Sequence, residues 1–270
     1  MIHLQSNEYF LNSKMSVTTE PRSPQQVFPE HDHSFDEIIV VSKGNGIHVV
    51  NDIPMNLSRN YVCFVGKKDR HLIEQVDELF LCNILYKKDQ LSSSALLEKY
   101  LPQPEEETVD WFIDDETALR VNYIIERLDH ESHTHCAESR AMSELLFQQL
   151  VVELWRGRIQ DERILTQEDR LLSSIVFMNK NYDQPLNIDE IAQHVKVSSR
   201  LLSKAIKDIT GMSFNQYLHF IRAKNAISLL INTDISVTDI AFMVGYSDSN
   251  YFSTKFKQTM HRKPSDIRVG

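Results

Sequence analysis

The sequence predicts an α+β protein built from two domains, an N-terminal β-barrel extended by helices and a C-terminal domain that is entirely helical. Short apolar runs separated by turn residues occupy the chain up to about residue 86, and helical periodicity replaces them from residue 115 onward. One helix-turn-helix pattern then occurs twice in the C-terminal part. A chain of 270 residues is long enough to bury two hydrophobic cores.

The expected strands are runs rich in Ile, Val, Tyr and Phe, at 35–41, 46–50, 61–65 and 79–86. Turn residues separate them, with Gly44 and Gly46 marking one predicted turn and Asn51 to Pro54 the next. Strands at this spacing, joined by hairpin turns, indicate a small sandwich or barrel.

Two helices are predicted after the strands, at 115–128 and 138–156. The second carries a wide apolar surface that includes Met142, Leu146 and Leu150. This surface either packs against the β domain or also forms a dimer interface, and both alternatives stay open. The polar stretch 160–167 is the predicted linker.

The C-terminal repeat contains two pairs of helices, predicted at 189–195 with 199–209 and at 239–244 with 249–259. Its apolar positions recur at offsets of 49 and 50 residues: Ile188, Ile191, Ala192 and Val195 match Val237, Ile240, Ala241 and Val244, and Leu202 and Ile206 match Phe252 and Phe256. A connecting helix at 213–231 spans about 27 Å. Successive major grooves lie roughly 34 Å apart, so the two pairs could enter adjacent grooves of one DNA duplex.

The first copy places Leu202 and Ile206 inward and leaves a polar set outward. The residues of this set predicted to contact DNA are Arg200, Ser203, Lys204 and Lys207. Arg200 and Lys204 lie one turn apart, where either can reach O6 and N7 of guanine, and Lys207 is better placed for a phosphate. Solvated charges on an ordinary surface helix are the alternative.

The second copy presents short polar groups in place of the charges. Its predicted DNA contacts are Asp248, Ser249, Asn250, Ser253 and Thr254. Asn can pair with adenine and Asp can accept from cytosine, although Asp248 also suits a helix N-cap. Asp239 follows Ser236 in a capping pattern, so it is either a structural cap or a contact with RNA polymerase.

The charge of the chain is unevenly distributed. The net charge is −9, but residues 168–270 hold 13 Lys and Arg against 10 Asp and Glu, and the rest of the chain holds 16 against 28. The basic excess coincides with the repeat and permits phosphate binding. The sequence predicts neither a signal peptide nor a membrane span, and the spacing of Cys63, Cys82 and Cys136 is not typical of a metal site. A cytoplasmic protein with free thiols is expected.

Residues 186–268 resemble the DNA-binding domain of the AraC/XylS family of transcription activators. The most specific part of the match is the Gly245-Tyr246 turn with Phe252 and Phe256. Lys196 departs from the Gly or Ala that the family often has before the first recognition helix, and Ala205 takes a position that is often basic. The resemblance implies a homodimeric activator that binds double-stranded promoter DNA and contacts RNA polymerase.

Four residues of the N-terminal half match the motifs of the cupin fold. His31, His33 and Glu37, followed by Gly44, resemble its first motif, and His71 stands where the second motif supplies its histidine. Alternation places the first three on one face of a strand edge. Three histidines and a carboxylate could hold a divalent metal ion, which is one interpretation. Histidines that merely fill a barrel mouth are another.

A third interpretation is a metal-free sugar site. The same four side chains, with Phe35, Arg70 and Asn83, supply hydrogen-bond groups and an apolar wall. The segments 28–31, 44–49 and 69–72 are similar to the sensor half of the rhamnose-responsive members of the family. That similarity implies L-rhamnose or a related sugar as effector and rhamnose catabolic or transport genes as targets.

Two classes of function follow from these patterns, an effector-controlled transcription activator and a metal-dependent cupin enzyme with an accessory helical domain. The activator is preferred, because no catalytic acid or base stands out beyond the four candidate ligands. We therefore expect no enzymatic activity, no catalytic residue and no required cofactor. The predicted domains are a cupin-like effector-binding and dimerisation domain at 1–159, the linker at 160–167, and a tandem helix-turn-helix domain at 168–270.

Overall fold

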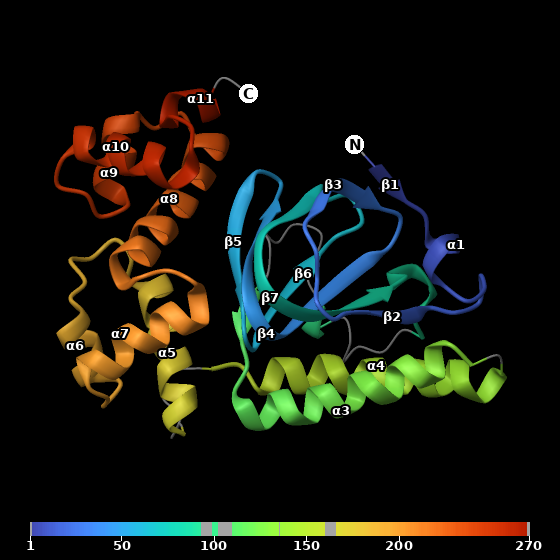
Figure 1. The fold of residues 1–270 in the computed structure, drawn as a ribbon. Helices are drawn as coiled ribbons and strands as arrows, with labels where there is room; N and C mark the ends of the chain where they lie inside the picture. The colour runs from blue at the N-terminus through green and yellow to red at the C-terminus, as the bar shows by residue number, and fades with distance from the viewer. Residues whose placement is uncertain (1, 93–98, 102–109, 135, 160–165, 269–270) are drawn as a thin grey trace. The chain divides into compact units, whose positions relative to one another are not determined.

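The computed structural model describes residues 2–92, 99–101, 110–134, 136–159 and 166–268. The chain divides into two compact units, Met1–Asn51 with Asn56–Gln160, and Asp52–Met55 with Asp161–Gly270 (Figure 1). Residues 160–165 of the predicted linker lie outside the described residues, and Thr166 caps the first helix of the second unit. Within the described ranges, no helix is both long and apolar enough to cross a membrane.

The first unit is built on one sheet of eight strands. Its path runs β1-β3-β7-β4-β6-β8, with β2 paired to β7 and β5 paired to β4. The elements are β1 (Ile2–Leu4), α1 (Ser6–Tyr9), β2 (Val17–Arg22), β3 (Phe28–His33), β4 (Asp36–Val50), β5 (Ile53–Ser58), β6 (Tyr61–Val65), β7 (His71–Tyr86), the short 3-10 helix η1 (Lys88–Gln90) and β8 (Asp110–Phe112).

The longest strands, β4 and β7, pair antiparallel from Asp36 opposite Tyr86 to Val50 opposite His71. The predicted hairpin turn at Gly44 and Gly46 is wrong, because β4 runs through it with shifts of register between Val41 and Ile47. Gly44 has φ 76°, and a Cβ there would lie 2.0 Å from the carbonyl oxygen of Glu78. Bulges of this kind bend a strand, so one sheet can curl around a core.

The next predicted turn is confirmed. Asn51 and Asp52 have φ of 48° and 69° and join β4 to β5. Asn and Asp tolerate this left-handed conformation better than most residues. Ile53 and Pro54 already belong to β5.

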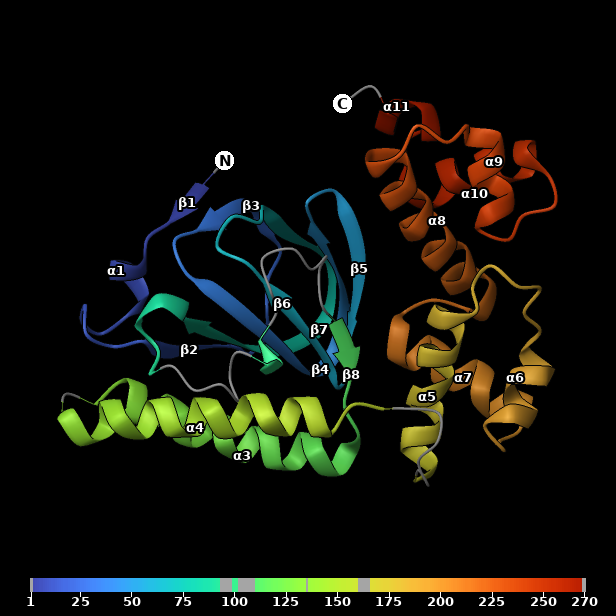
Figure 2. The same cartoon turned by 180° about the vertical axis from the view of Figure 1, so that it is seen from behind.

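Two helices cover one side of this sheet, α3 (Asp115–Ser132) and α4 (Ala137–Arg156), and lie side by side in both views (Figures 1 and 2). Phe147, Leu150 and Leu154 of α4 share a buried cluster with Ile38 and Ile84 of the sheet. The apolar surface predicted on this helix therefore packs against the β domain.

Residues 166–268, which make up most of the second unit, form helices without any strand. They are α5 (Gln167–Lys180), α6 (Ile188–His194), α7 (Ser199–Thr210), α8 (Phe214–Asn232), α9 (Val237–Met243), α10 (Ser249–Met260) and α11 (Pro264–Arg268). The α8 helix lies between the two helix pairs in both views (Figure 2). The predicted fold class, α+β with a sheet-rich N-terminal half and a helical C-terminal half, is confirmed.

The helices of the two copies begin at the corresponding positions of the repeat. Ile188 and Val237 begin α6 and α9, an offset of 49, and Ser199 and Ser249 begin α7 and α10, an offset of 50. The four N-caps also correspond: Asn187 to Ser236 and Ser198 to Asp248. The side chain of each N-cap accepts a hydrogen bond from a backbone N–H of the first turn, and this bond fixes the residue at which the helix begins.

Candidate functional site

The β domain encloses a cavity of about 480 Å³, counted out to its opening. Its wall is mixed: Phe35, Ile39 and Leu85 supply apolar surface beside the polar groups. Strand pairing explains the convergence, since Glu37 lies opposite Leu85 and Ile39 opposite Asn83 in the β4–β7 ladder. A wall of this mixed character is typical of a small-molecule site.

The structure brings together most of the residues predicted for the effector. The cavity is lined by His31, His33, Phe35, Glu37, His71 and Asn83. Arg70 is not among the lining residues, and its Nη1 donates to Glu30 Oε1 at 2.8 Å instead. Its neighbour His71, the first residue of β7, lines the cavity. The predicted contact of Arg70 with the effector stays a prediction.

Four polar lining residues were not predicted from the sequence: Tyr9, Glu20, Arg22 and Gln25. Glu20 and Arg22 alternate on β2, with 3.5 Å between Glu20 Oε2 and Arg22 Nη2. The first strand predicted from the sequence is 35–41, and Pro21 argues against a strand at 17–22. The alternation of Thr18, Glu20 and Arg22 was the available signal.

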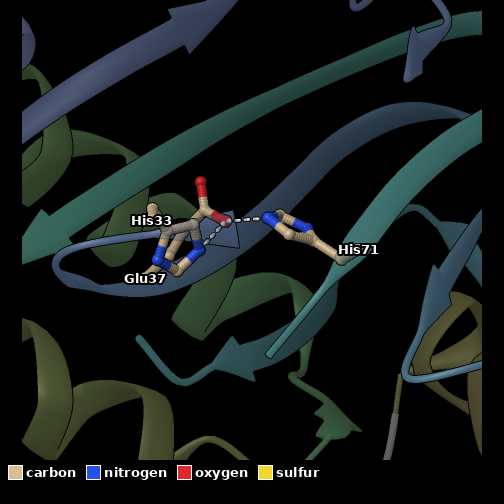
Figure 3. A group of neighbouring side chains, drawn as sticks. All are labelled: His33, Glu37 and His71. Atoms are coloured by element: carbon tan, nitrogen blue, oxygen red, sulfur yellow. Dashed lines mark ion pairs between the residues drawn. The ribbon is translucent and has the colours of Figure 1, made fainter. Parts of the chain in front are cut away.

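His33, Glu37 and His71 point toward one another inside the cavity (Figure 3). Oε2 of Glu37 lies 3.8 Å from Nε2 of His33 and 3.8 Å from Nε2 of His71. All three side chains are buried. His31, the fourth candidate ligand, is outside this group: its Nδ1 bonds the carbonyl of Pro29 at 2.9 Å, and its ring centre lies 4.0 Å from that of His71.

Both histidines of the group are held through their other ring nitrogen. Nδ1 of His33 donates to the carbonyl oxygen of Phe35 at 2.6 Å. Nδ1 of His71 lies 2.8 Å from Nε2 of His48, whose own Nδ1 lies 3.8 Å from Sγ of Cys63. These contacts fix both rings so that each Nε2 faces Glu37.

Burial controls the protonation states of the titratable side chains in and next to the cavity. It lowers the pKa of His33 to about 4 and the pKa of His48 to about 3, and it also lowers the pKa of His71. Burial raises the pKa of Glu37 to about 8, against a smaller lowering by Arg22. The rings are therefore neutral, and the carboxylate is costly unless it gains a partner.

Four buried polar atoms of the cavity have no hydrogen-bond partner among the described residues. They are Nε2 of His33, Oε2 of Glu37, Nε2 of His71 and Oδ1 of Asn83. Buried polar atoms in folded proteins are nearly always paired, with protein, water or ligand. This concentration in one cavity marks a place built for a polar ligand.

The second unit carries the predicted DNA-contacting residues on two exposed helix faces. On α7, Leu202 and Ile206 are buried, whereas the predicted residues Arg200, Ser203, Lys204 and Lys207 are exposed. On α10, Phe252 and Phe256 are buried, Asn250 and Thr254 are exposed, and Ser249 and Ser253 are half-buried. The offset of 50 also places the exposed Lys257 at the position of Lys207, a pairing that the repeat itself could have revealed.

Two of the predicted contacts have a structural role. Oδ1 of Asp248 accepts the backbone N–H of Tyr251 at 2.6 Å and so caps α10. Oδ2 of Asp239 accepts from the Ser236 hydroxyl at 2.5 Å, at the start of α9, and the side chain remains exposed. Ser253 and Thr254 donate their hydroxyls to backbone carbonyls of their own helix, those of Ser249 and Asn250.

Both halves of the chain match known domain families. Residues 14–150 match the AraC-like ligand-binding domain, and residues 191–269 match a helix-turn-helix domain. The HTH-type transcriptional activator RhaS of Yersinia pestis (strain Pestoides F) is 36% identical over 271 residues, covering 99% of each chain. RhaS of Yersinia pseudotuberculosis serotype O:3 is similar to the same extent, with 36% identity and 99% coverage of each chain.

Solved structures show weaker likeness. The C-terminal domain of AraT, a response regulator from Geobacillus stearothermophilus, is 34% identical with a TM-score of 0.36, over 37% of this chain and 84% of that one. ToxT from Vibrio cholerae is 14% identical with a TM-score of 0.37, over 94% of this chain and 98% of that one.

Proposed function

We propose that a small sugar, bound in the cavity of the β domain, controls the activity of this protein. The premise is that the chain belongs to the AraC family and is a DNA-binding transcription activator rather than an enzyme. L-rhamnose is the proposed effector, and rhamnose catabolic or transport genes are the proposed targets. The alternative of a metal-dependent cupin enzyme is set aside, since the relatives and both domain matches are those of a transcription regulator.

The observation that carries the effector proposal is the set of four unpaired polar atoms in a cavity with apolar walls. A sugar offers hydroxyl groups, which both donate and accept, and C–H faces that pack against apolar side chains. His33, His71, Glu37 and Asn83 would bind the hydroxyls, and Phe35 with Leu85 would contact the ring. Sites that hydrogen-bond hydroxyls discriminate strongly against analogues that lack them.

Control of transcription requires that the sugar bind one state of the protein more tightly than another. The sugar then shifts the population toward that state by its difference in affinity, and DNA shifts sugar affinity by the same factor. A factor of 5 to 150 is usual for such coupling, or about 1–3 kcal/mol.

On DNA, we assign the two recognition helices to adjacent major grooves. Arg200 and Lys204 would contact guanine edges, Asn250 an adenine edge, and Lys207 a phosphate. The α8 helix of 19 residues separates the helix pairs and spans about 28 Å. Asp239, exposed at the start of α9, is the proposed contact with RNA polymerase.

We also propose a homodimer formed through α3 and α4. Leu119 and Tyr123 stand one turn apart on α3 and are 72% and 63% exposed, and Leu145 on α4 is 59% exposed. Large apolar side chains exposed on helix surfaces are typical of an interface. A Tyr123→Glu variant is expected to sediment as a monomer. Asn122→Glu is the control for an added charge, because Asn122 is exposed and lies about 100° away from Tyr123 around the helix. Equal sedimentation of both variants with the wild type would refute this interface.

The effector is tested by calorimetric titration of the full chain with L-rhamnose. Asn83→Leu should weaken binding at least tenfold, because Oδ1 of Asn83 is buried in the cavity. Arg70→Gln is the matched control, because Arg70 precedes His71 on the chain but does not line the cavity. Binding that both variants keep, or no binding by the wild type, would overturn the proposal.

Control of DNA binding is tested separately, on a promoter fragment over a salt series with and without L-rhamnose. Sequence-specific binding or transcription that responds to L-rhamnose and not to D-glucose supports the proposal. An identical response to both sugars would reject L-rhamnose as the effector.

A further inference from the structure

We propose that His33, Glu37 and His71 form a binding site for one divalent transition-metal ion in the wall of the cavity. The ligand atoms would be Nε2 of each histidine and Oε2 of Glu37. The inference concerns the same cavity as the effector, but it does not require that the effector be a sugar.

The distances suit a metal better than direct contact among the side chains. The two separations of 3.8 Å from Glu37 Oε2 are too long for hydrogen bonds. Around a tetrahedral ion with bonds of about 2.0–2.1 Å, neighbouring ligand atoms lie about 3.4 Å apart. The two separations from Glu37 would therefore close around an ion by about 0.4 Å each, and all three ligand atoms already lie within 4.8 Å of one another.

The histidines are held as metal-binding histidines are. A metal ligand needs a bare lone pair on one ring nitrogen and gains from a partner that holds the other N–H. The carbonyl oxygen of Phe35 accepts Nδ1–H of His33, which leaves the lone pair on Nε2. Nε2 of His48 stands in place to accept Nδ1–H of His71, and Cys63 Sγ lies next to His48 Nδ1. When His33, His48 and His71 each carry their proton on Nδ1, the Nε2 lone pairs of His33 and His71 both face Oε2 of Glu37.

A bound ion would satisfy all three orphaned atoms at once. Each is buried and without a hydrogen-bond partner in the described chain. A hydroxyl group has a single proton to donate, so it can pair with only one of three acceptors, whereas a dication attracts all three. Two imidazoles and one carboxylate form a ligand set typical of zinc and of non-haem iron.

The fourth cupin-motif histidine, His31, does not complete the set, because it is not among the residues whose ligand atoms lie within 4.8 Å of one another, and its ring packs on that of His71. Three protein ligands leave at least one coordination position free. A hydroxyl group of a ligand in the cavity could take that position, which would make the ion part of effector recognition.

The experiment uses the untagged full chain after dialysis against EDTA. Titration with Zn²⁺ by calorimetry and with Co²⁺ by visible absorption is expected to show one ion per chain. Glu37→Gln and His71→Gln should each raise the dissociation constant at least 100-fold. His3→Gln is the matched control: it removes a histidine that pairs with Asp32 on the surface, 51% exposed, and it should bind as the wild type does.

Circular dichroism and DNA binding of each variant establish that it is folded. An absence of binding to the folded wild type would overturn the inference, and so would binding that Glu37→Gln and His71→Gln keep, since the ion would then be adventitious. L-rhamnose titration of the same protein, once after EDTA treatment and once after Zn²⁺ has been restored, decides the effector proposal separately. A metal site without sugar binding, or sugar binding without a metal site, would each reject one proposal and leave the other standing.

Discussion

The two helix-turn-helix copies share a backbone and differ in chemistry. Their helices begin and end at constant offsets, and Leu202 and Ile206 occupy the buried positions of Phe252 and Phe256. At the outward positions, Arg200 and Lys204 correspond to Asn250 and Thr254. The buried positions therefore keep apolar residues and preserve the geometry of the helix pair, whereas the exposed positions differ in charge and in hydrogen-bonding groups.

The copies also differ in where they place glycine. The turn residue is Lys196 with φ 58° in the first copy and Gly245 with φ 88° in the second. The residue after the recognition helix is Gly211 with φ 76° in the first and His261 with φ 58° in the second. Each copy therefore holds one non-glycine residue in the left-handed region, at a different end of its recognition helix.

The largest expected effect is at the second turn. A Cβ on Gly245 would lie 2.5 Å from the carbonyl oxygen of Asp183, so Gly245→Ala adds a steric clash to the left-handed backbone. We expect it to lower the free energy of unfolding by about 3 kcal/mol. Lys196→Ala, at the matching exposed position, should change it by no more than about 0.5 kcal/mol. Urea unfolding followed by circular dichroism measures both, and equal losses would show that the two turns are equally constrained.

The base contacts should differ in their dependence on salt. Arg200→Ala and Asn250→Ala are each expected to weaken specific binding by about 1–3 kcal/mol. Only Arg200→Ala should also flatten the plot of log affinity against log salt, because only that change removes a charge that displaces counterions. Fluorescence anisotropy on one promoter fragment over a salt series tests this, and equal slopes would contradict the proposed asymmetry.

The helix caps separate structure from base contact. Asp248→Ala should cost about 1 kcal/mol of stability through loss of the N-cap, as should Ser198→Ala in the first copy. Asp248→Ser keeps a capping hydroxyl and should restore that stability. Loss of selectivity at one base pair in Asp248→Ser would identify a base contact by the carboxylate, whereas unchanged selectivity would leave capping as its only role.

The smallest effect is expected at the corresponding lysines Lys207 and Lys257. Each change to Gln should weaken binding uniformly across DNA sequences and reduce the salt slope by about 1. Binding to specific and random fragments measures this, and selectivity lost in one variant alone would make that lysine a base contact.

Sequence patterns predicted the helical unit closely and the β unit only in part. The connector predicted at 213–231 is α8 at Phe214–Asn232, because apolar periodicity and the Ser213 cap act within a few residues of each other. The segment at Gly44 was misassigned as a turn, because its bulged course depends on Glu78, which follows 34 positions later in the chain. Glu20 and Arg22 were not predicted for the same reason: the face that a strand presents depends on its distant partner.

By itself the sequence determined the α+β class, the tandem repeat, its inward and outward faces, and six of the residues that line the cavity, since each rests on local spacing or on a motif. Only the tertiary structure decided that Glu37 meets His33 and His71 while His31 turns to Pro29, and that Arg70 stays outside. The physical reason is that a helix sets its faces by contacts three or four residues apart, whereas a cavity in a curled sheet is assembled by pairings across the whole domain.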